Sequence, residues 1–237
     1  MIPRLLIDSA PIPGGGGELR LVQRGADFWI MLGANALMST RLRGSEEALA
    51  TLVCERLAGR PRPALLIGGL GMGFTLRAAL GALGAGSRLV VAELVPAIVR
   101  WARGPMAQVH GASLDDPRVE IVEGDVRDLI DAARAEYDAI LLDVDNGPEA
   151  LSRETNDRLY DLAGLRRARS ALRPGGILAV WSSGPDKAFA RRLAEAGFAV
   201  EEVTVRAHAG RSGAKHVIWL AAARGGHQIR TRSSGGM

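Results

Sequence analysis

Short apolar runs and segments of helical periodicity alternate along the chain from residue 64 onward. Apolar runs of this length are typical of strands buried on both faces, and repeated strand–helix units predict a parallel sheet covered by helices on each side. The last two runs have no helix between them, which predicts a terminal hairpin and one antiparallel strand. The expected strands are 64–68, 88–93, 118–122, 138–143, 176–181, 198–206 and 215–221, and the expected helices are 74–83, 96–103, 126–134, 156–172 and 186–196.

The pattern before residue 64 is different. Residues 18–24 alternate polar and apolar side chains, as a half-buried strand does. Residues 27–32 and 36–42 have the composition of further short strands. We therefore expect a small N-terminal β-meander, with Trp29 and Met31 in its core.

A helix is predicted to link the meander to the alternating region. Ser45 is the expected N-cap, and Glu46 and Glu47 place two acids in the first turn, where they complement the helix dipole. Pro61 and Pro63 mark the end of this link. We therefore expect three parts: residues 1–60 form the meander and linking helix, 61–223 the α/β domain, and 224–237 a flexible basic tail.

Composition excludes several classes of protein. Hydrophobic residues make up 47% of the 237, too many for a chain that is disordered throughout. No apolar run approaches the roughly 20 residues of a membrane helix, and residues 1–8 do not make a secretory signal. The single Cys54 cannot form an internal disulfide, and we expect it as a small buried side chain. These features predict a cytoplasmic protein without a membrane partner.

Positive charge is concentrated at the C-terminus. The formal net charge is +4, and the last fourteen residues supply three arginines, Arg224, Arg230 and Arg232, and no acid. The rest of the chain is therefore near neutral, which argues against nucleic acid as a partner of the folded part. RNA binding by the tail is the alternative.

The strongest chemical signal is a glycine turn after the first strand of the α/β domain. Gly69, Gly71 and Gly73 lie between an apolar run and a predicted helix, and glycine allows a ligand to approach the backbone closely. Glu93 ends the next strand about twenty residues further on, where a carboxylate can accept hydrogen bonds from a ribose diol. Together they predict an adenosine-type cofactor. NAD(P) is the alternative, although Phe74 stands where a dinucleotide fingerprint has its third glycine.

Two further strand ends carry acids. Asp125 can accept a hydrogen bond from an adenine amino group while Val126 packs against the ring; the alternative is that Asp125 caps the following helix. Asp143 and Asp145 would point the same way in an extended chain, at the edge where such sheets bind ligands. We expect them to be functional, the alternative being an acidic turn in which Asp143 caps backbone amides.

Other chemistries find little support. The four histidines and Cys54 show no metal-ligand spacing, so no metal is expected, and no Gly-x-Ser-x-Gly motif offers a hydrolase nucleophile. Trp181 and the following Ser182 and Ser183 end the fifth strand of the α/β domain. They either border an acceptor pocket or serve for packing and as a serine cap for helix 186–196.

A larger set of motifs resembles one known family. The motifs are Gly68-Gly-x-Gly-x-Gly73 with Thr75-Leu-Arg77, Val91-Ala-Glu93-Leu, Asp116-Pro-Arg-Val119, Glu123-Gly-Asp125, Tyr137-Asp-x-Ile-x-x-Asp143, Gly147-Pro148 and Leu172-Arg-Pro-Gly-Gly-Ile-Leu178. Over roughly residues 18–206, their order and spacing resemble the spermidine synthase (polyamine aminopropyltransferase) family. The resemblance implies a class I methyltransferase-like, or Rossmann-like, fold with a small N-terminal β-domain.

The resemblance also implies roles for individual residues. Glu93 would hold the ribose of a 5′-adenosyl sulfonium donor, Asp125 its adenine, and Asp143 would deprotonate an incoming amine. Asp145 would be a second acceptor-binding carboxylate. The partners implied are S-adenosylmethionine or its decarboxylated form as donor, a small-molecule amine as acceptor, and a second copy of the chain in a homodimer.

Three departures from the family pattern keep alternatives open. Gly71 stands where the family's glycine loop has an aspartate that grips the aminopropyl group, Gly44-Ser-Glu-Glu47 replaces the family's Tyr-His-Glu, and Asp143-Val-Asp-Asn-Gly-Pro148 replaces its Asp-x-x-Asp-Pro. Intact S-adenosylmethionine carries a carboxylate that an aspartate would repel, so Gly71 suits it better. Methyl transfer to a small molecule is therefore the close alternative, and a non-catalytic nucleoside-binding protein is the third. If the family's domain geometry holds, Glu46 and Glu47 face the substrate rather than serve only as first-turn charges.

Overall fold

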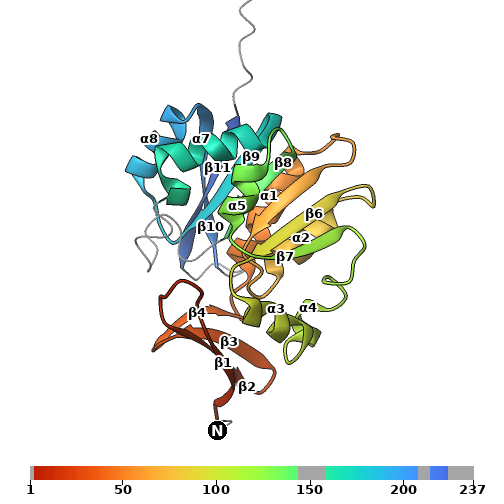
Figure 1. The fold of residues 1–237 in the computed structure, drawn as a ribbon, viewed down its shortest axis with the longest axis vertical. Helices are drawn as coiled ribbons and strands as arrows, with labels where there is room; N and C mark the ends of the chain where they lie inside the picture. The colour runs from red at the N-terminus through yellow and green to blue at the C-terminus, as the bar shows by residue number, and fades with distance from the viewer. Residues whose placement is uncertain (1–2, 144–157, 208–213, 224–237) are drawn as a thin grey trace, which may run out of the picture.

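Two β-sheets organise the protein. The computed structural model describes residues 3–143, 158–207 and 214–223, and Figure 1 shows a small sheet at the N-terminus below a larger, helix-covered sheet. The small sheet has four strands and the large sheet has seven.

The small sheet is an antiparallel meander in the order β1-β2-β3-β4. It confirms the predicted meander and adds one strand to it, β1, at the N-terminus. The core expectation for Trp29 and Met31 was wrong, because Phe28 and Ile30 take the buried face and put their alternate neighbours on the other side. The strands are β1 (Leu5–Pro11), β2 (Glu18–Arg24), β3 (Asp27–Leu32) and β4 (Asn35–Ser39).

The large sheet has the order β10-β11-β9-β8-β5-β6-β7. β11 pairs antiparallel with both β10 and β9, and the pairs among β5 to β9 are parallel. This confirms the predicted seven-stranded, mostly parallel sheet with an antiparallel last strand. The strands are β5 (Ala64–Gly68), β6 (Arg88–Glu93), β7 (Val119–Glu123), β8 (Tyr137–Leu142), β9 (Leu172–Ser182), β10 (Phe198–Arg206) and β11 (Lys215–Ala223).

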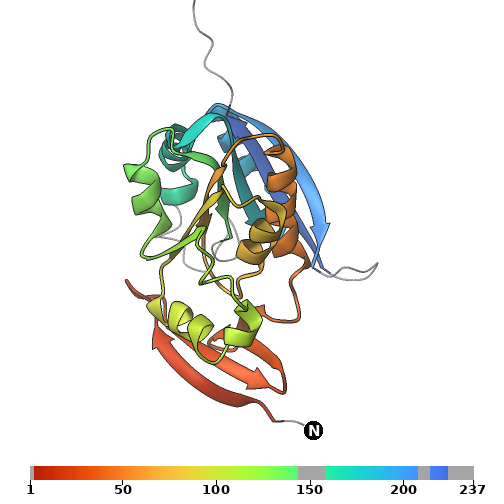
Figure 2. The same cartoon turned by 90° about the vertical axis from the view of Figure 1, so that its right-hand side faces the viewer.

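Helices cover both faces of the large sheet, so its central strands are apolar throughout. In β5, Leu65 and Ile67 belong to the core under α1 and α2, whereas Leu66 belongs to the core under α5, α7 and α8. Figure 2 shows these two helical layers on opposite sides of the sheet. No described helix is long and apolar enough to cross a membrane. The helices are α1 (Gly44–Arg56), α2 (Phe74–Ala82), α3 (Pro96–Arg103), α4 (Ala107–His110), α5 (Val126–Ala132), α7 (Leu162–Ala171) and α8 (Lys187–Glu195).

The small sheet packs on the carboxyl end of the large one. Leu21 and Ile30 share one apolar cluster with Leu70 of the glycine turn and Ile98 of α3. On α3, Trp101 Nε1 donates a hydrogen bond to an Asp8 carboxylate oxygen in β1, at 2.7 Å. The N-terminal meander is thereby placed directly beside the glycine turn.

Ser45 does not cap α1 as expected. The N-cap residue is Arg43, and it forms no side-chain capping bond. The Ser45 hydroxyl lies 2.9 Å from His216 Nδ1 of β11 instead, and the Gly44 N–H donates to the Ala207 carbonyl. The start of α1 is therefore held by β10 and β11 rather than by its own serine.

Candidate active site

The glycine turn connects β5 to α2 in the predicted strand–turn–helix arrangement. Gly69, Gly71 and Gly73 have φ of +91°, +50° and +74°, in the left-handed region that favours glycine. Gly73 is also the N-cap residue of α2. The spacing of the glycines therefore has a backbone reason that is independent of any ligand, and their role in cofactor binding stays a prediction.

Two protein side chains lie against this turn. A Cβ atom placed on Gly71 would be 2.9 Å from Met38 Sδ of β4, and one placed on Gly73 would be 2.5 Å from Nδ1 of His110 in α4. The space on the Cβ side of both glycines is thus already taken by the protein. A ligand that uses this turn must approach it from another side.

Glu93 ties the glycine turn to the end of β6. Its carboxylate is 5% exposed and accepts hydrogen bonds from the N–H groups of Leu70, at 2.8 Å, and Val95, at 2.9 Å. Glu93 therefore has a structural role, and its proposed ribose contact stays a prediction.

Asp125 is the N-cap of α5. One of its oxygens accepts from the Arg127 N–H at 2.9 Å, and the other accepts from the Arg127 guanidinium at 2.7 and 3.0 Å. Val126 is buried, and its methyl groups lie 3.1 and 3.3 Å from a Cβ atom placed on Gly68. The capping alternative is therefore present in the structure, and the adenine contact stays a prediction.

Asp143 directly follows β8 at the same edge of the sheet. Its N–H donates to the Gly68 carbonyl at 3.1 Å, and its Oδ2 accepts from the Thr75 hydroxyl of α2, also at 3.1 Å. Burial raises the pKa of Asp143 to about 6, and the hydrogen bond from Thr75 opposes that rise. The carboxyl group is thus in the range that suits proton transfer near neutral pH. Asp145 lies outside the described residues.

Glu46 of α1 joins this group, although it is far from Asp143 in the sequence. The Thr75 hydroxyl lies 3.4 Å from the Glu46 carbonyl oxygen as well as 3.1 Å from Asp143. Burial raises the pKa of the Glu46 carboxyl well above its usual range, and the charges of Asp143 and Glu47 raise it further. Local sequence marks Glu46 only as a first-turn acid, because its neighbour Asp143 comes from another part of the chain.

An aromatic wall borders the first turn of α1. The rings of Trp181 and His216 meet edge to face with centroids 4.7 Å apart, and His216 contacts Ser45. Burial lowers the pKa of His216, so this imidazole favours its neutral form. Trp181 Nε1 is shielded from solvent and has no hydrogen-bond partner among the described residues.

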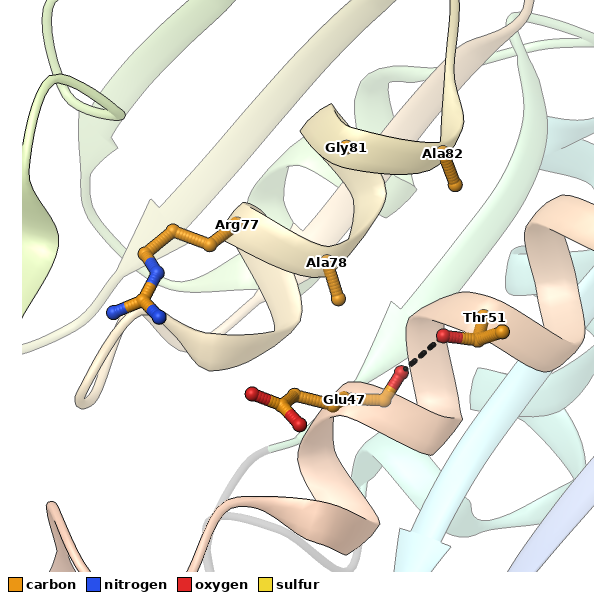
Figure 3. Close-up of a pocket in the computed structure, with 6 residues that line it drawn as sticks. All are labelled: Glu47, Thr51, Arg77, Ala78, Gly81 and Ala82. Carbon is orange, nitrogen blue, oxygen red and sulfur yellow. Dashed lines mark hydrogen bonds between the residues drawn. The ribbon is translucent and has the colours of Figure 1, made fainter.

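Glu47 points to a different place from Glu46. It lines a groove of about 400 Å³ between α1 and α2. Figure 3 shows Glu47 across this groove from Arg77. On the α2 side, the groove is lined by the small residues Ala78, Gly81 and Ala82. The two adjacent acids therefore have separate surroundings.

Comparison with known proteins shows similarity over the region that contains these site residues. The family model described as "Spermine/spermidine synthase domain" matches residues 44–187, from α1 to the start of α8. The polyamine aminopropyltransferase 1 of Streptomyces coelicolor is 34% identical over 164 residues, which cover 65% of this chain and 30% of that protein. The polyamine aminopropyltransferase 2 of Pseudomonas aeruginosa is 36% identical over 124 residues, covering 51% of this chain and 33% of that protein.

A solved structure shares the fold. The spermidine synthase of Thermotoga maritima superposes with a TM-score of 0.71 at 19% identity, covering 92% of this chain and 72% of that one. The chain spans only about a third of the length of the two curated relatives above. Because the family model matches more than half of the sequence, the chain belongs to the spermine/spermidine synthase family.

Proposed function

We propose that this protein is a transferase that moves the aminopropyl group of a 5′-adenosyl sulfonium donor to an amine acceptor. The observation that carries the proposal is Asp143, a carboxyl whose pKa is raised to about 6 at the sheet edge, beside the glycine turn of a spermine/spermidine synthase domain. A base that titrates near neutral pH is what deprotonation of an amine requires.

The chemical step is a displacement at the carbon next to the sulfonium. The amine nitrogen forms a bond to that carbon, the carbon–sulfur bond breaks, and its electron pair neutralises the sulfur. The nitrogen attacks with its lone pair, so its extra proton must leave first, and the Asp143 carboxylate accepts it. The protein's second contribution is alignment of nitrogen, carbon and sulfur, which the glycine turn and Glu93 would provide by fixing the donor.

Methyl transfer from intact S-adenosylmethionine is the second candidate, and the surroundings of Gly71 favour it. No carboxylate projects from position 71, and Met38 Sδ lies 2.9 Å from where a Cβ atom would be. The turn therefore offers no acid at this position to hold a cationic aminopropyl chain or to repel the carboxylate of intact S-adenosylmethionine.

One assay separates the two reactions. The protein is incubated with S-adenosylmethionine or its decarboxylated form and a mixture of linear diamines, and product masses show whether an aminopropyl or a methyl group has been added. We expect aminopropylated amine from the decarboxylated donor. Methylated product from the intact donor would replace this proposal with the second candidate, and no product from either donor would leave the nucleoside-binding alternative.

The role of Asp143 is tested by Asp143→Asn, which keeps the size of the side chain. Loss of the base should lower the transfer rate by about 100- to 10,000-fold while donor binding, measured by calorimetry, is kept. Asp115→Asn is the matched control, because Asp115 is an exposed acid paired with Arg103. Equal rates for the two variants would show that Asp143 is not the base.

A further inference from the structure

Two acidic residues from distant segments lie at the proposed acceptor site, close enough for the charge of Asp143 to raise the pKa of Glu46. Asp143 follows β8 and Glu46 lies in the first turn of α1, and the Thr75 hydroxyl lies between Asp143 Oδ2 and the Glu46 backbone carbonyl. A hydroxyl has one proton to donate, and the shorter distance is to Asp143. Thr75 therefore donates to the Asp143 carboxylate, and its second contact is to the backbone of Glu46, not to its carboxyl group.

The Glu46 carboxyl is unpaired in the described part of the chain. Its Oε2 is shielded from solvent and finds no hydrogen-bond partner there. Nor does any described arginine or lysine form an ion pair with Glu46 or Asp143. A buried carboxylate without a partner is unfavourable, so this group must carry a proton or receive a cation.

Another buried carboxyl group in the protein, that of Asp138, does have ion-pair partners. Asp138 is 3% exposed and is paired with Arg60 at 2.6 Å and Arg173 at 2.7 Å, and it also accepts from the Ala64 N–H. Asp138 is thus saturated by cations of the chain itself. Among the described residues, no arginine or lysine serves Glu46 or Asp143 in this way.

We propose that Glu46, together with Asp143, binds the cationic nitrogen of the amine acceptor. The inference rests on the proposed function, and it assigns a residue to the acceptor side of the site. In the free protein Glu46 carries a proton and Asp143 a negative charge. An alkylammonium ion that enters between them favours the ionised form of Glu46, so one proton passes from Glu46 to solvent when the amine binds.

The groups around Glu46 support this exchange. Asp143 faces it from the end of β8, whereas Glu47 affects its pKa through charge from a side chain in the outer groove. Thr75 on α2 is uncharged, and His216 on β11, which contacts the neighbouring Ser45, has its pKa lowered by burial and favours the neutral form. None of these groups is a cation; the cation at the start of α1, Arg43, pairs with Glu47 at 3.7 Å rather than with Glu46.

Carboxyl titration tests the pair without any substrate. Protein labelled with ¹³C at side-chain carboxyls is titrated by NMR as the unaltered chain, Glu46→Gln and Asp143→Asn. We expect one glutamate to keep its proton at neutral pH, to disappear in Glu46→Gln, and to titrate at lower pH in Asp143→Asn because the neighbouring negative charge is gone. Ordinary titration of Glu46, unchanged in Asp143→Asn, would overturn the pairing.

Amine binding tests the acceptor role directly. 1,4-Diaminobutane is titrated calorimetrically into donor-loaded protein in buffers with different ionisation enthalpies, which reveals the protons released. We expect about one proton from the unaltered chain, none from Glu46→Gln, and an affinity about 10- to 100-fold weaker in that variant. Glu47→Gln is the matched control, because Glu47 lies in the outer groove of Figure 3, and it should bind like the unaltered chain.

The outcomes separate this inference from the proposed function. Equal amine binding and proton release by Glu46→Gln and Glu47→Gln would overturn the role of Glu46 and leave the transferase proposal standing. Absence of amine binding by the unaltered chain would overturn both. Melting temperatures of the two glutamine variants, which differ by one position in the same helix turn, show whether a loss reflects unfolding instead.

Discussion

At the scale of single residues, His110 makes the clearest prediction. Its imidazole is 1% exposed, both ring nitrogens lack hydrogen-bond partners among the described residues, and the ring lies against Gly73. Burial, followed by the charge of Arg77, lowers its pKa to about 4. The folded protein thus holds a neutral ring, whereas the unfolded chain gains a proton below about pH 6.5.

Because of His110, the free energy of unfolding should decrease as the pH is lowered. Because its folded pKa is depressed, its contribution is fully present above about pH 6.5 and is lost as the pH falls towards 4. Between about pH 7 and pH 5 the loss should be about 2 kcal/mol. Urea unfolding of the unaltered protein and of His110→Leu at both pH values measures it: the variant should lose less stability by about that amount. The same loss in both proteins would contradict the prediction.

At the scale of elements, helix α8 shows how far local sequence reasoning reaches. The pattern predicted the helix at 186–196 with a serine as one interpretation of its cap, and the structure has it at Lys187–Glu195 with Asp186 as N-cap. One Asp186 oxygen accepts from the N–H groups of Ala188 and Phe189. Asp186→Ala should therefore lower the free energy of unfolding by about 1 kcal/mol, and Asp186→Asn by less. Equal denaturation midpoints for all three proteins would show that the cap contributes nothing.

Elements with strong local signals were predicted well, and those fixed by distant contacts were not. Apolar runs predicted β5 and β6 with the observed limits, and Pro96 at its start did the same for α3. β1 was missed because Leu5 and Leu6 are both exposed and its pairing with β2 is irregular between Leu6 and Asp8, so the strand has no regular alternation.

The same division holds for the candidate site. The glycine turn and the acid after β8 follow from local pattern and from the rule that parallel strands present their carboxyl ends at one edge. The bond from the Leu70 N–H to Glu93 and the charge effect of Asp143 on Glu46 depend on contacts between separate segments of the chain. Ser45 was predicted as a helix cap because its actual partner, His216, is 171 positions away and cannot be inferred from local sequence.

At the scale of the whole molecule, the N-terminal sheet helps to determine what the glycine turn can contain. Met38 of β4 reaches across to Gly71, so its thioether fills the volume into which the family's loop aspartate would project. Position 71 also has a φ of +50°, which glycine adopts freely and aspartate at a cost. A side chain at position 71 would therefore compete with Met38 for the same space.

Restoring the acid should accordingly require a change in both sheets. Gly71→Asp alone should lower the free energy of unfolding by about 1–3 kcal/mol, because the new side chain strains the backbone and displaces Met38. Adding Met38→Ala should return part of that stability, so the double-mutant cycle should give a favourable coupling of at least about 0.5 kcal/mol. In the double variant, calorimetry should show that the decarboxylated donor gains affinity relative to intact S-adenosylmethionine. A carboxylate at position 71 attracts the ammonium group of the decarboxylated donor and repels the carboxylate of the intact one. Met38→Ala alone is the control for lost packing. Additive effects on stability with an unchanged donor ratio would mean that Met38 and position 71 act independently, and that the N-terminal sheet has no part in donor choice.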